Sequence, residues 1–347
     1  MIAIVILNWN GSKLMRKFLP SVIANSQDLG EVIVADNGSD DDSLEMLERE
    51  FPQIRLLRFE KNYGFAEGYN VAFEELRKMS EVGAAPSYDY YLLLNSDVEV
   101  TPGWLVPMFE YMESHSDCAA CQPKIMAEYN RGFFEYAGAC GGYIDRYGYP
   151  FCRGRVFAVT EEDRGQYDDV ADIFWATGAA LLVRASDWHV HGGFDGRFFA
   201  HNEEIDFCWR LRSRGRRVVC VPQSMVFHVG GGTLPQDNPR KTYLNFRNNL
   251  TMLYKNLPED EIRHVMRWRT LLDLVAALQF LAKGDAANFK AIRRARRDFR
   301  AWRRDFEADR RENLRFATLE NIPERCRFNL IFQYYLLRRR MFSQIFR

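Results

Sequence analysis

Short apolar runs alternate with segments of helical periodicity through the first part of the chain, and this alternation is the strongest constraint on the fold. The runs have the length of strands and lie at residues 2–8 (IAIVILN), 31–35 (EVIVA), 54–59 and 90–94 (YYLLL). Helical periodicity follows residue 12 and recurs over residues 44–50 and 65–79. Strands that are apolar throughout are typical of parallel sheets with helices on both faces. We therefore predict an α/β, Rossmann-like fold with a mostly parallel central sheet and flanking helices.

Polar side chains follow three of these strands at their carboxyl ends. Asn8 and Trp9 end the first strand, Asp36 ends the second, and Asn95 and Asp97 follow the fourth. In sheets of this kind, ligands bind beyond the carboxyl ends of the strands. Oxygen ligands two residues apart suit a shared divalent cation, and the Asp36 carboxylate could accept from the imide N–H of a uracil or thymine ring. Asn and Asp are also ordinary turn residues, so a ligand-binding role and a simple turn both stay open for Asn95-Ser96-Asp97 and for Asp36-Asn37-Gly38-Ser39, each taken alone.

Three acidic residues begin a predicted helix over residues 203–214, which Gly215 closes. Glu203, Glu204 and Asp206 lie in its first turn, where the helix dipole stabilises carboxylates whatever else they do. In a partly apolar pocket, one of these carboxylates would have a raised pKa and could act as a general base.

Asn70 and His228 are further candidates, each with two interpretations. Asn70 lies in NYGFAEGYN, where glycines at a helix start permit either close approach of a ligand or close helix packing. His228 follows an apolar run and precedes three glycines, residues 230–232. It is either a packed structural residue or a ligand, and the glycines would let a loop close over a bound phosphate. The chain has neither a GxGxxG nor a GK[ST] motif, which disfavours dinucleotide and P-loop chemistry.

The second half of the chain has a less regular pattern. Residues 120–175 are rich in Gly and Tyr and are predicted to form loops and short antiparallel strands. A strand over residues 218–221 is expected to end at Pro222. Residues 256–347 combine helical periodicity with runs of arginine, and we predict a helical segment separate from a first domain of residues 1–255. From residue 260 onward, 21 Lys and Arg stand against 11 Asp and Glu, although the whole chain is neutral.

The basic carboxyl-terminal segment has two interpretations. Residues 285–306 place apolar side chains at helical spacing among arginines, which suits a helix lying on an anionic membrane. A helix that packs on the catalytic domain or pairs in a homodimer has the same pattern. The longest apolar run, residues 271–282, contains Asp273 and is too short to span a bilayer, and the amino terminus has no signal-peptide pattern. We expect a cytoplasmic protein with reduced cysteines, either free or peripheral at the inner face of the cytoplasmic membrane.

Taken together, the motifs resemble a known family. VILNWNG, VIVADNGSDDDS, NYGFAEGYN, YYLLLNSDVEV, FWATGAALLVR, GGFDGRFFAHNEEIDFCWRLRSRG and VFHVGG occur here in the order found in family-2 inverting glycosyltransferases, which have the GT-A fold. The chain most resembles bacterial rhamnosyltransferase-like members of cell-envelope polysaccharide biosynthesis. The resemblance covers about residues 1–255.

The resemblance implies a dTDP- or UDP-linked sugar donor, a divalent cation (Mg²⁺ or Mn²⁺), and single displacement by a hydroxyl of a glycan or lipid-linked acceptor. No nucleic-acid partner is expected. Asn8 and Trp9 would border the base and ribose, Asp36 would recognise the pyrimidine, and Asn70 would lie beside the diphosphate. Asp97 matches the last position of the family's DxD motif and His228 a downstream histidine, so these two would bind the metal. Asn95 stands where the motif has its first aspartate.

The resemblance also assigns the catalytic base and the sugar pocket. Glu204 matches the second acid of the family's acidic pair and is the implied base, with Glu203 and then Asp206 as rivals. The segment that lines the donor-sugar and acceptor pocket contains Trp175, Gly178 and Ala179.

Two alternatives remain beside the transferase. The asparagine at position 95 is compatible with a catalytically inactive member that acts as a binding or scaffold subunit. Sugar nucleotidyl transfer is disfavoured, because residues 8–17 lack a Gly-rich basic phosphate loop.

Overall fold

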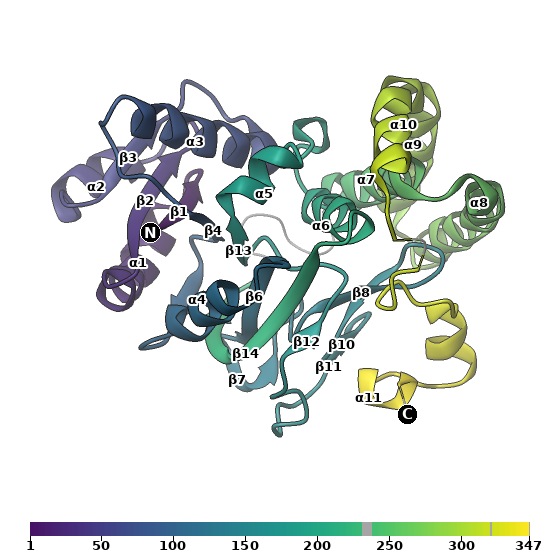
Figure 1. Cartoon of the computed structure of the whole chain (residues 1–347). Coiled ribbons are helices and arrows are strands. Elements are labelled where there is room, and N and C mark those ends of the chain that lie inside the picture. The colour runs from purple at the N-terminus through teal and green to yellow at the C-terminus, as the bar shows by residue number, and fades with distance from the viewer. Residues whose placement is uncertain (231–237, 320, 347) are drawn as a thin grey trace.

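The computed structural model describes residues 1–230, 238–319 and 321–346. Strands and helices alternate through its amino-terminal part, as predicted (Figure 1). The elements there are β1 (Ile2–Asn8), α1 (Ser12–Ser26), β2 (Gly30–Asp36), α2 (Ser43–Glu50), β3 (Arg55–Arg58), α3 (Gly64–Glu81), β4 (Tyr90–Leu94), β5 (Val98–Val100) and α4 (Leu105–Ser114).

The middle of the chain completes the sheet and adds a small second one. Its elements are β6 (Cys118–Ala127), β7 (Asn130–Phe134), β8 (Gly142–Ile144), β9 (Pro150–Cys152), β10 (Arg155–Val156), β11 (Val159–Thr160), β12 (Ala171–Asp172), β13 (Ala180–Arg184), α5 (Ala185–Val190), the 3₁₀-helix η1 (Gly196–Phe198), α6 (Glu203–Ser213) and β14 (Arg217–His228). The small sheet has the order β11-β10-β9-β8.

The central sheet has the strand order β12-β14-β6-β13-β4-β1-β2-β3, with β5 paired to β14 and β7 to β6. β1 is parallel to β2 and β4, β2 to β3, and β14 to β6, whereas β13 is antiparallel to both neighbours. The mostly parallel α/β sheet is thus confirmed. The register places Asn8 opposite Asp36, and Ile6 opposite Leu94. The polar residues that follow β1, β2 and β4 therefore lie at one edge of the sheet.

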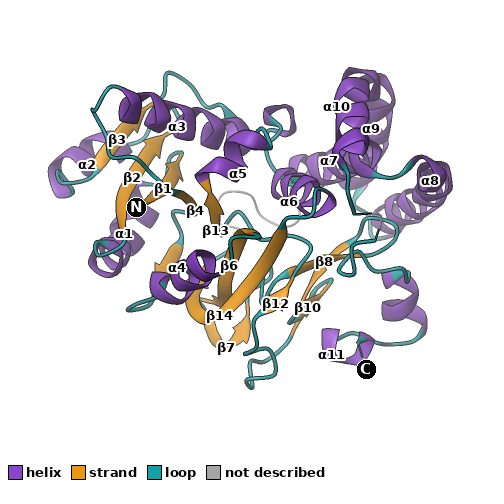
Figure 2. Ribbon diagram, viewed as in Figure 1, coloured by secondary structure: helices purple, strands orange, loops and turns teal. Residues whose placement is uncertain are grey.

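Helices cover both faces of this sheet (Figure 2). Met15 of α1 and Met108 of α4 pack in one buried cluster with the sheet residue Leu92. Phe73 of α3 and Phe207 of α6 belong to the other cluster. Because both faces are covered, the strands are apolar throughout, as the sequence pattern indicates.

Two expectations for the middle of the chain are wrong. Residues 118–127 are not irregular but form β6, which is buried at all ten positions. Polar residues such as Lys124 break the apolar pattern that would have predicted this strand. Lys124 can be buried because its ammonium pairs with Asp163 at 2.7 Å and with Asp168. Pro222 does not end its strand, because β14 continues to His228 through a register shift between Val221 and Met225.

The carboxyl-terminal part is helical, as predicted, and lies at the right of Figure 1. Its elements are α7 (Pro239–Asn256), α8 (Glu259–Ala282), α9 (Ala286–Trp302), the 3₁₀-helix η2 (Arg303–Phe306), α10 (Glu307–Phe316), the π-helix η3 (Phe332–Leu336) and α11 (Phe342–Ile345). Leu253, Ile262 and Phe306 belong to the same buried cluster as the sheet residue Leu93. The core is therefore continuous across residue 255, and the division into two domains there stays a prediction.

The apolar side chains of residues 285–306 face the protein. Ile292, Ala295, Phe299 and Phe306 are at most 7% exposed, and α9 packs on α7 and α8. These positions are therefore not available to a membrane, and the packing interpretation holds for them. Within the described ranges, no helix has both the length and the apolar character needed to cross a bilayer.

Candidate active site

The ends of β1 and β2 are joined by side-chain hydrogen bonds. Asn8 is fully buried, and its Nδ2 donates to Asp36 Oδ2 at 2.9 Å and to Ser39 Oγ at 3.2 Å. Asp36 Oδ1 accepts from the Ser39 backbone N–H at 2.9 Å. The Asn8 Oδ1 atom is buried without a partner, whereas the Trp9 residue beside it is 46% exposed. The contacts of Asn8, Trp9 and Asp36 with a nucleotide stay predictions.

The start of α3 contacts two segments that lie far from it in the sequence, one at Gly178 and one at Phe199. A Cβ added at Gly64 would lie 2.5 Å from the Phe199 ring, and one added at Gly178 would lie 2.9 Å from Phe65. The backbone N–H of Phe65 donates to the Phe199 carbonyl at 2.6 Å. For Gly64, the structure therefore supports close packing, the second interpretation of the glycine-rich motif.

Asn70 lies in α3 and forms hydrogen bonds with Phe194, in the segment before α6. Its Nδ2 donates to the Phe194 carbonyl at 2.8 Å and to Glu67 Oε2 at 3.0 Å, and its Oδ1 accepts from the Phe194 N–H at 3.0 Å. All of its amide donors and its acceptor are therefore used within the protein. Its place beside the diphosphate stays a prediction, and in the structure Asn70 holds the segment before α6.

Asp97 and His228 meet at the sheet edge. β5 pairs with β14 so that His228 lies opposite Val98, and His228 Nε2 is 3.1 Å from Asp97 Oδ1. Asn95 Nδ2 lies 3.3 Å from the same ring nitrogen. Strand pairing thus brings together the two residues predicted to bind metal, although 131 positions separate them in the chain.

Sequence reasoning missed Glu135, which contacts the other side of the histidine. Its Oε2 lies 3.4 Å from His228 Nδ1, and both side chains are about 4% exposed. Burial alone lowers the pKa of His228, but its hydrogen bonds and charge interactions with Asp97 and Glu135 outweigh burial and raise the pKa to about 10. Burial alone raises the pKa of Asp97, yet the contacts with His228 and backbone N–H groups outweigh it and leave the pKa below its ordinary value.

The donor set at this edge fits a divalent cation that arrives with a diphosphate. Among the described residues, no three His, Cys, Asp or Glu side chains are arranged to hold a metal on their own. Mg²⁺-type sites commonly use one or two protein ligands, with substrate phosphates and waters supplying the rest. A carboxylate and an imidazole would supply two such ligands here, and a cation at His228 Nε2 would replace the imidazole proton.

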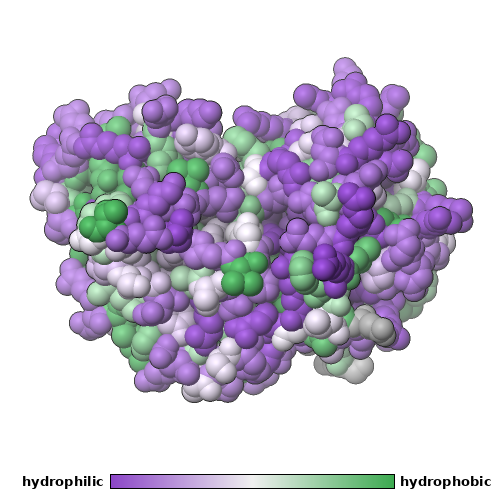
Figure 3. All heavy atoms as spheres, turned by 45° about the horizontal axis from the view of Figure 1, so that its top comes forward, coloured by the Kyte–Doolittle hydropathy of each residue, from purple (hydrophilic) through white to green (hydrophobic). Residues whose placement is uncertain are grey.

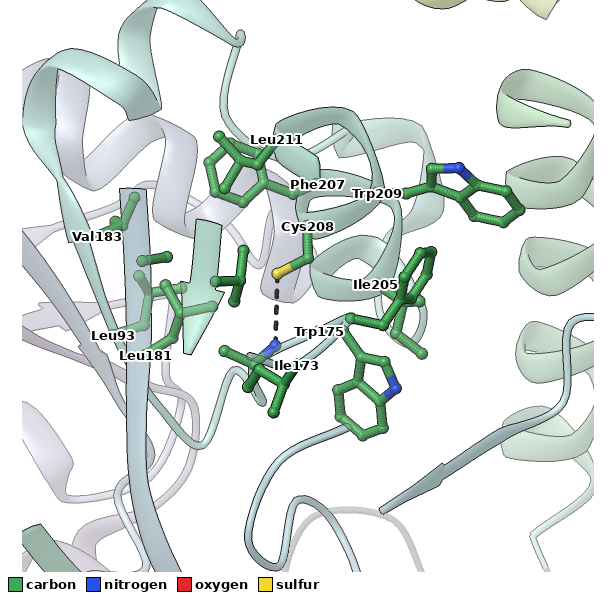
Figure 4. Close-up of a cluster of buried hydrophobic side chains, with 14 of the residues drawn as sticks. Leu93, Ile173, Trp175, Leu181, Val183, Ile205, Phe207, Cys208, Trp209 and Leu211 are labelled. Atoms are coloured by element: carbon green, nitrogen blue, oxygen red, sulfur yellow. Dashed lines mark hydrogen bonds between the residues drawn. The ribbon is translucent and has the colours of Figure 1, made fainter. Parts of the chain in front are cut away.

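Apolar packing fixes the helix that carries the acidic residues. Ile205, Phe207 and Trp209 of α6 enter the core around it, and Cys208 Sγ accepts from the Ala176 N–H at 3.5 Å (Figure 4). The first turn of α6 is therefore held against the segment that contains Trp175.

Glu203 and Glu204 are neighbouring carboxyl groups without side-chain partners. Each has an Oε2 atom that is buried and unpartnered. Burial raises the pKa of Glu204 to about 7. Burial and the neighbouring Glu204 charge raise the pKa of Glu203 well above its ordinary value. Glu203 is 3% exposed and Glu204 is less buried, so Glu204 is the more accessible of the two.

Asp206 has a different environment from the two glutamates. Its Oδ2 accepts from Lys255 Nζ at 2.8 Å and from Arg210 Nε at 3.1 Å, and its Oδ1 accepts from Asn256 Nδ2 at 2.8 Å. It is fully buried. Its carboxylate is therefore occupied in joining α6 to α7, which disfavours it as the catalytic base.

The loop before α6 has strained backbone. Phe199, His201 and Asn202 have φ of 68°, 73° and 69°, values uncommon for residues with a side chain. Asn248 of α7 holds this loop, because its Nδ2 lies within 3.0 Å of the carbonyls of Phe198, Ala200 and His201. Strain of this kind persists only where surrounding contacts fix it, and it is concentrated at functional sites. No sequence signal singled out Asn248.

The three residues predicted to line the sugar pocket differ in their placement. Ala179 borders the site, because its carbonyl accepts from the Asn95 N–H at 3.0 Å. Gly178 lies against Phe65. Trp175 is 3% exposed and its indole N–H donates to the Tyr143 carbonyl at 3.0 Å. Contact of these residues with a sugar stays a prediction.

Comparisons with known proteins agree with this geometry. Residues 3–154 match the model of glycosyl transferase family 2. An N-acetylglucosaminyl-diphospho-decaprenol L-rhamnosyltransferase of Mycobacterium tuberculosis is 25% identical over 231 residues, which are 65% of this chain and 75% of that protein. The rhamnosyltransferase WbbL of Escherichia coli K12 is 27% identical over 168 residues, covering 48% of this chain and 61% of WbbL.

Solved structures share the fold at low identity. GalNAc-T7 with UDP, GalNAc and Mn²⁺ has a TM-score of 0.58 at 14% identity, over 89% of this chain but only 56% of that one. The mannosyltransferase PcManGT of Pyrobaculum calidifontis, in complex with GDP-Man and Mn²⁺, has a TM-score of 0.50 at 11% identity, over 90% of this chain and 85% of that one.

The sheet, the polar strand ends and these likenesses define a glycosyltransferase of the GT-A fold. Within that class, residues 3–154 are similar to glycosyl transferase family 2, and the relatives named above are rhamnosyltransferases.

Proposed function

We propose that the protein is an inverting transferase that moves a sugar, rhamnose first among the candidates, from a dTDP- or UDP-linked donor to a hydroxyl of a lipid-linked glycan acceptor. The observation that carries the proposal is Glu204, a carboxyl at the start of α6 with an unpartnered oxygen and a pKa raised by burial to about 7. A base with this pKa is well matched to proton removal near neutral pH. The rhamnosyltransferase names of the relatives support the choice of sugar.

The reaction is a single displacement. The acceptor hydroxyl gives its proton to Glu204 while its oxygen forms a bond to the anomeric carbon of the donor. The bond from that carbon to the diphosphate oxygen breaks, and the nucleoside diphosphate leaves with the electron pair. Attack opposite the leaving group inverts the anomeric centre. A divalent cation held by Asp97 and His228 would neutralise charge on the departing diphosphate.

The surface beside the loop before α6 favours an acceptor that carries phosphate. A groove of about 1250 Å³ lies between α7 and α9 and begins at Phe199. Eight of its fourteen described lining residues are Lys or Arg and none is acidic. Arg240, Lys290, Arg293 and Arg300 form no ion pair with described residues, whereas Arg294 and Arg297 share Asp298. Unpaired cations over an apolar floor suit a lipid diphosphate better than a neutral glycan.

A calorimetric titration tests the donor site. UDP and dTDP, each with and without Mn²⁺ or Mg²⁺, are titrated into the wild type, Asp97→Ala and the control Asp28→Ala, which changes an exposed aspartate of the same domain. We expect metal-dependent binding that Asp97→Ala removes and Asp28→Ala keeps. Absence of binding of either nucleotide under every condition would overturn the proposal.

A second measurement tests catalysis and stereochemistry. We expect wild-type protein to hydrolyse the preferred donor slowly and, with an acceptor, to form a product whose anomeric configuration by NMR is opposite to that of the donor. Nucleotide binding without hydrolysis or transfer would favour the scaffold alternative, and retention of configuration would refute the single displacement.

A further inference from the structure

Helix α8 exposes large apolar side chains, while it buries two charged ones, Arg269 and Asp273, among apolar residues. Its face toward the protein buries an ion network, in which Asp273 is fully buried and pairs with Arg269 at 3.1 Å and with Arg296 of α9. Its outward face carries large apolar side chains that are 42–55% exposed, namely Trp268, Leu271, Leu274, Val275, Leu278 and Leu281. A surface helix of a soluble domain normally has the opposite arrangement.

These six residues form one continuous stripe, because they are spaced three or four residues apart along the helix. Figure 3 shows apolar side chains along the right-hand border of the molecule, the side on which α8 lies in Figure 1. A contiguous exposed apolar surface of this size marks an interaction site more often than chance exposure. The stripe therefore requires a partner that accepts apolar side chains.

The charged residues beside the stripe are mostly cations, although an exposed Asp260 precedes it and a half-buried Asp285 follows it. Over residues 262–284 the only acidic residue is Asp273, which is buried. Arg263 and Arg267 lie exposed near one end of the stripe and Lys283 near the other. The neighbouring helix α9 exposes further cations along its length, including Arg293 and Arg297.

We propose that the outward face of α8 docks on an anionic lipid bilayer, with the apolar stripe inserted among the acyl chains and the flanking cations at the headgroups. An apolar face flanked by cations and an aromatic side chain is the pattern of helices that lie in a membrane interface. A second copy of the chain fits less well. In a pair of copies the cations Arg263, Arg267 and Lys283 of both chains would be brought together, with only Asp260 and Asp285 near the ends of the stripe to offset them.

This surface is distinct from the one predicted at residues 285–306. There the large apolar side chains are buried or half-buried and most of the exposed residues are cations, so α9 adds electrostatic attraction without insertion. The surface also goes beyond the proposed function, because it requires neither a sugar donor nor a base.

Vesicle flotation with the full-length protein tests the docking surface. The vesicles contain phosphatidylcholine alone or phosphatidylcholine with phosphatidylglycerol, at low salt and at high salt. The test variant carries Leu271→Gln, Leu274→Gln and Leu278→Gln, which keep helix propensity while removing apolar surface. The matched control carries Val82→Gln, Val106→Gln and Val190→Gln, at residues 79%, 42% and 76% exposed elsewhere on the molecule.

We expect wild type and control to float with anionic vesicles, more weakly with neutral ones, and the α8 variant to bind at least tenfold more weakly. Nucleotide binding by all three proteins checks that each is folded and separates failure of docking from failure of the proposed catalytic site. Equal flotation of the α8 variant and wild type, or no flotation of wild type, would overturn the proposal. A lipid-free wild-type dimer that the α8 substitutions convert to monomer would assign the stripe to a second copy instead.

Discussion

The pKa of Glu204 yields the sharpest prediction about the site. Burial raises this pKa from the ordinary 4.5 to about 7, and the proposed base acts only as the carboxylate. Activity should therefore be lost as pH falls through 7, with kcat/KM about tenfold lower for each pH unit below that value. An exposed glutamate, with a pKa of about 4.3, would leave the rate unchanged down to pH 5.

Two isosteric variants separate Glu204 from its neighbour. Glu204→Gln should lower kcat by about 10²- to 10⁴-fold, which is the scale of a positioned general base. It should also remove the fall in rate below pH 7, while donor binding is kept. Glu203 is the more buried of the two, and burial and the Glu204 charge raise its pKa well above its ordinary value. Since Glu204 is the proposed base, Glu203→Gln leaves the proton acceptor in place. We expect this variant to stay within about tenfold of wild type.

The assay is a pH–rate profile of donor consumption from pH 5 to 9 at saturating metal. A wild-type rate that stays constant between pH 5 and 7, near wild-type turnover in Glu204→Gln, or an equal loss in both variants would refute the assignment of Glu204 as base.

Three further predictions concern the residues around the proposed base and the proposed metal site. Asn248→Ala should lower kcat without changing donor affinity and destabilise the fold by about 1–3 kcal/mol, because three loop carbonyls lose their donor; steady-state kinetics and thermal unfolding measure both effects. Asn95→Asp should tighten Mn²⁺-dependent nucleotide binding by adding a carboxylate beside Asp97, and calorimetry showing weaker binding would contradict this. Lys255→Met leaves the buried Asp206 short of a cation and should destabilise the fold by about 3–5 kcal/mol in denaturant unfolding, whereas a cost below about 1 kcal/mol would show that Arg210 alone is sufficient.

Stability should also change with pH because of the acidic pair. A carboxyl with a raised pKa binds its proton more tightly in the folded state, so its contribution to stability is lost as pH rises from about 4.5 to 7. Glu204→Gln should therefore be more stable than wild type at pH 8, by up to about 3 kcal/mol, but not at pH 4. Equal melting temperatures of the two proteins at pH 8 would contradict the buried position of Glu204.

The sequence pattern predicts the amino-terminal sheet well because its strands are covered on both faces. Such strands are apolar throughout, and the turns after β1, β2 and β4 carry the polar residues that the fold brings together. The same rule failed for β6, where a buried lysine satisfied by two aspartates breaks the apolar pattern. It failed again at Pro222, because a bulge can accommodate a proline within a strand.

The contacts that shape the site come from pairs far apart in the chain, and no local pattern reports them. Glu135 beside His228 and Asn248 beside the 198–202 loop are ordinary polar residues until the fold places them. The acidic cluster of α6 could be found from sequence, but the distinction between Asp206 and the glutamates required the position of Lys255. The predicted glycine hinge after His228 is described only at Gly230, since residues 231 and 232 lie outside the described ranges.

The pairing of β5 with β14 has a consequence for how the enzyme is made. His228 reaches Asp97 only after β14 has been synthesised, and the loop before the base is held only once Asn248 of α7 follows. A ribosome therefore completes the strands of the proposed donor site before the proposed metal ligands and base have their full set of contacts. A chain interrupted before residue 248 would contain every strand of the sheet but lack the contact that holds the loop before α6, so we expect it to leave nucleotide sugars intact and incomplete synthesis not to waste the donor pool.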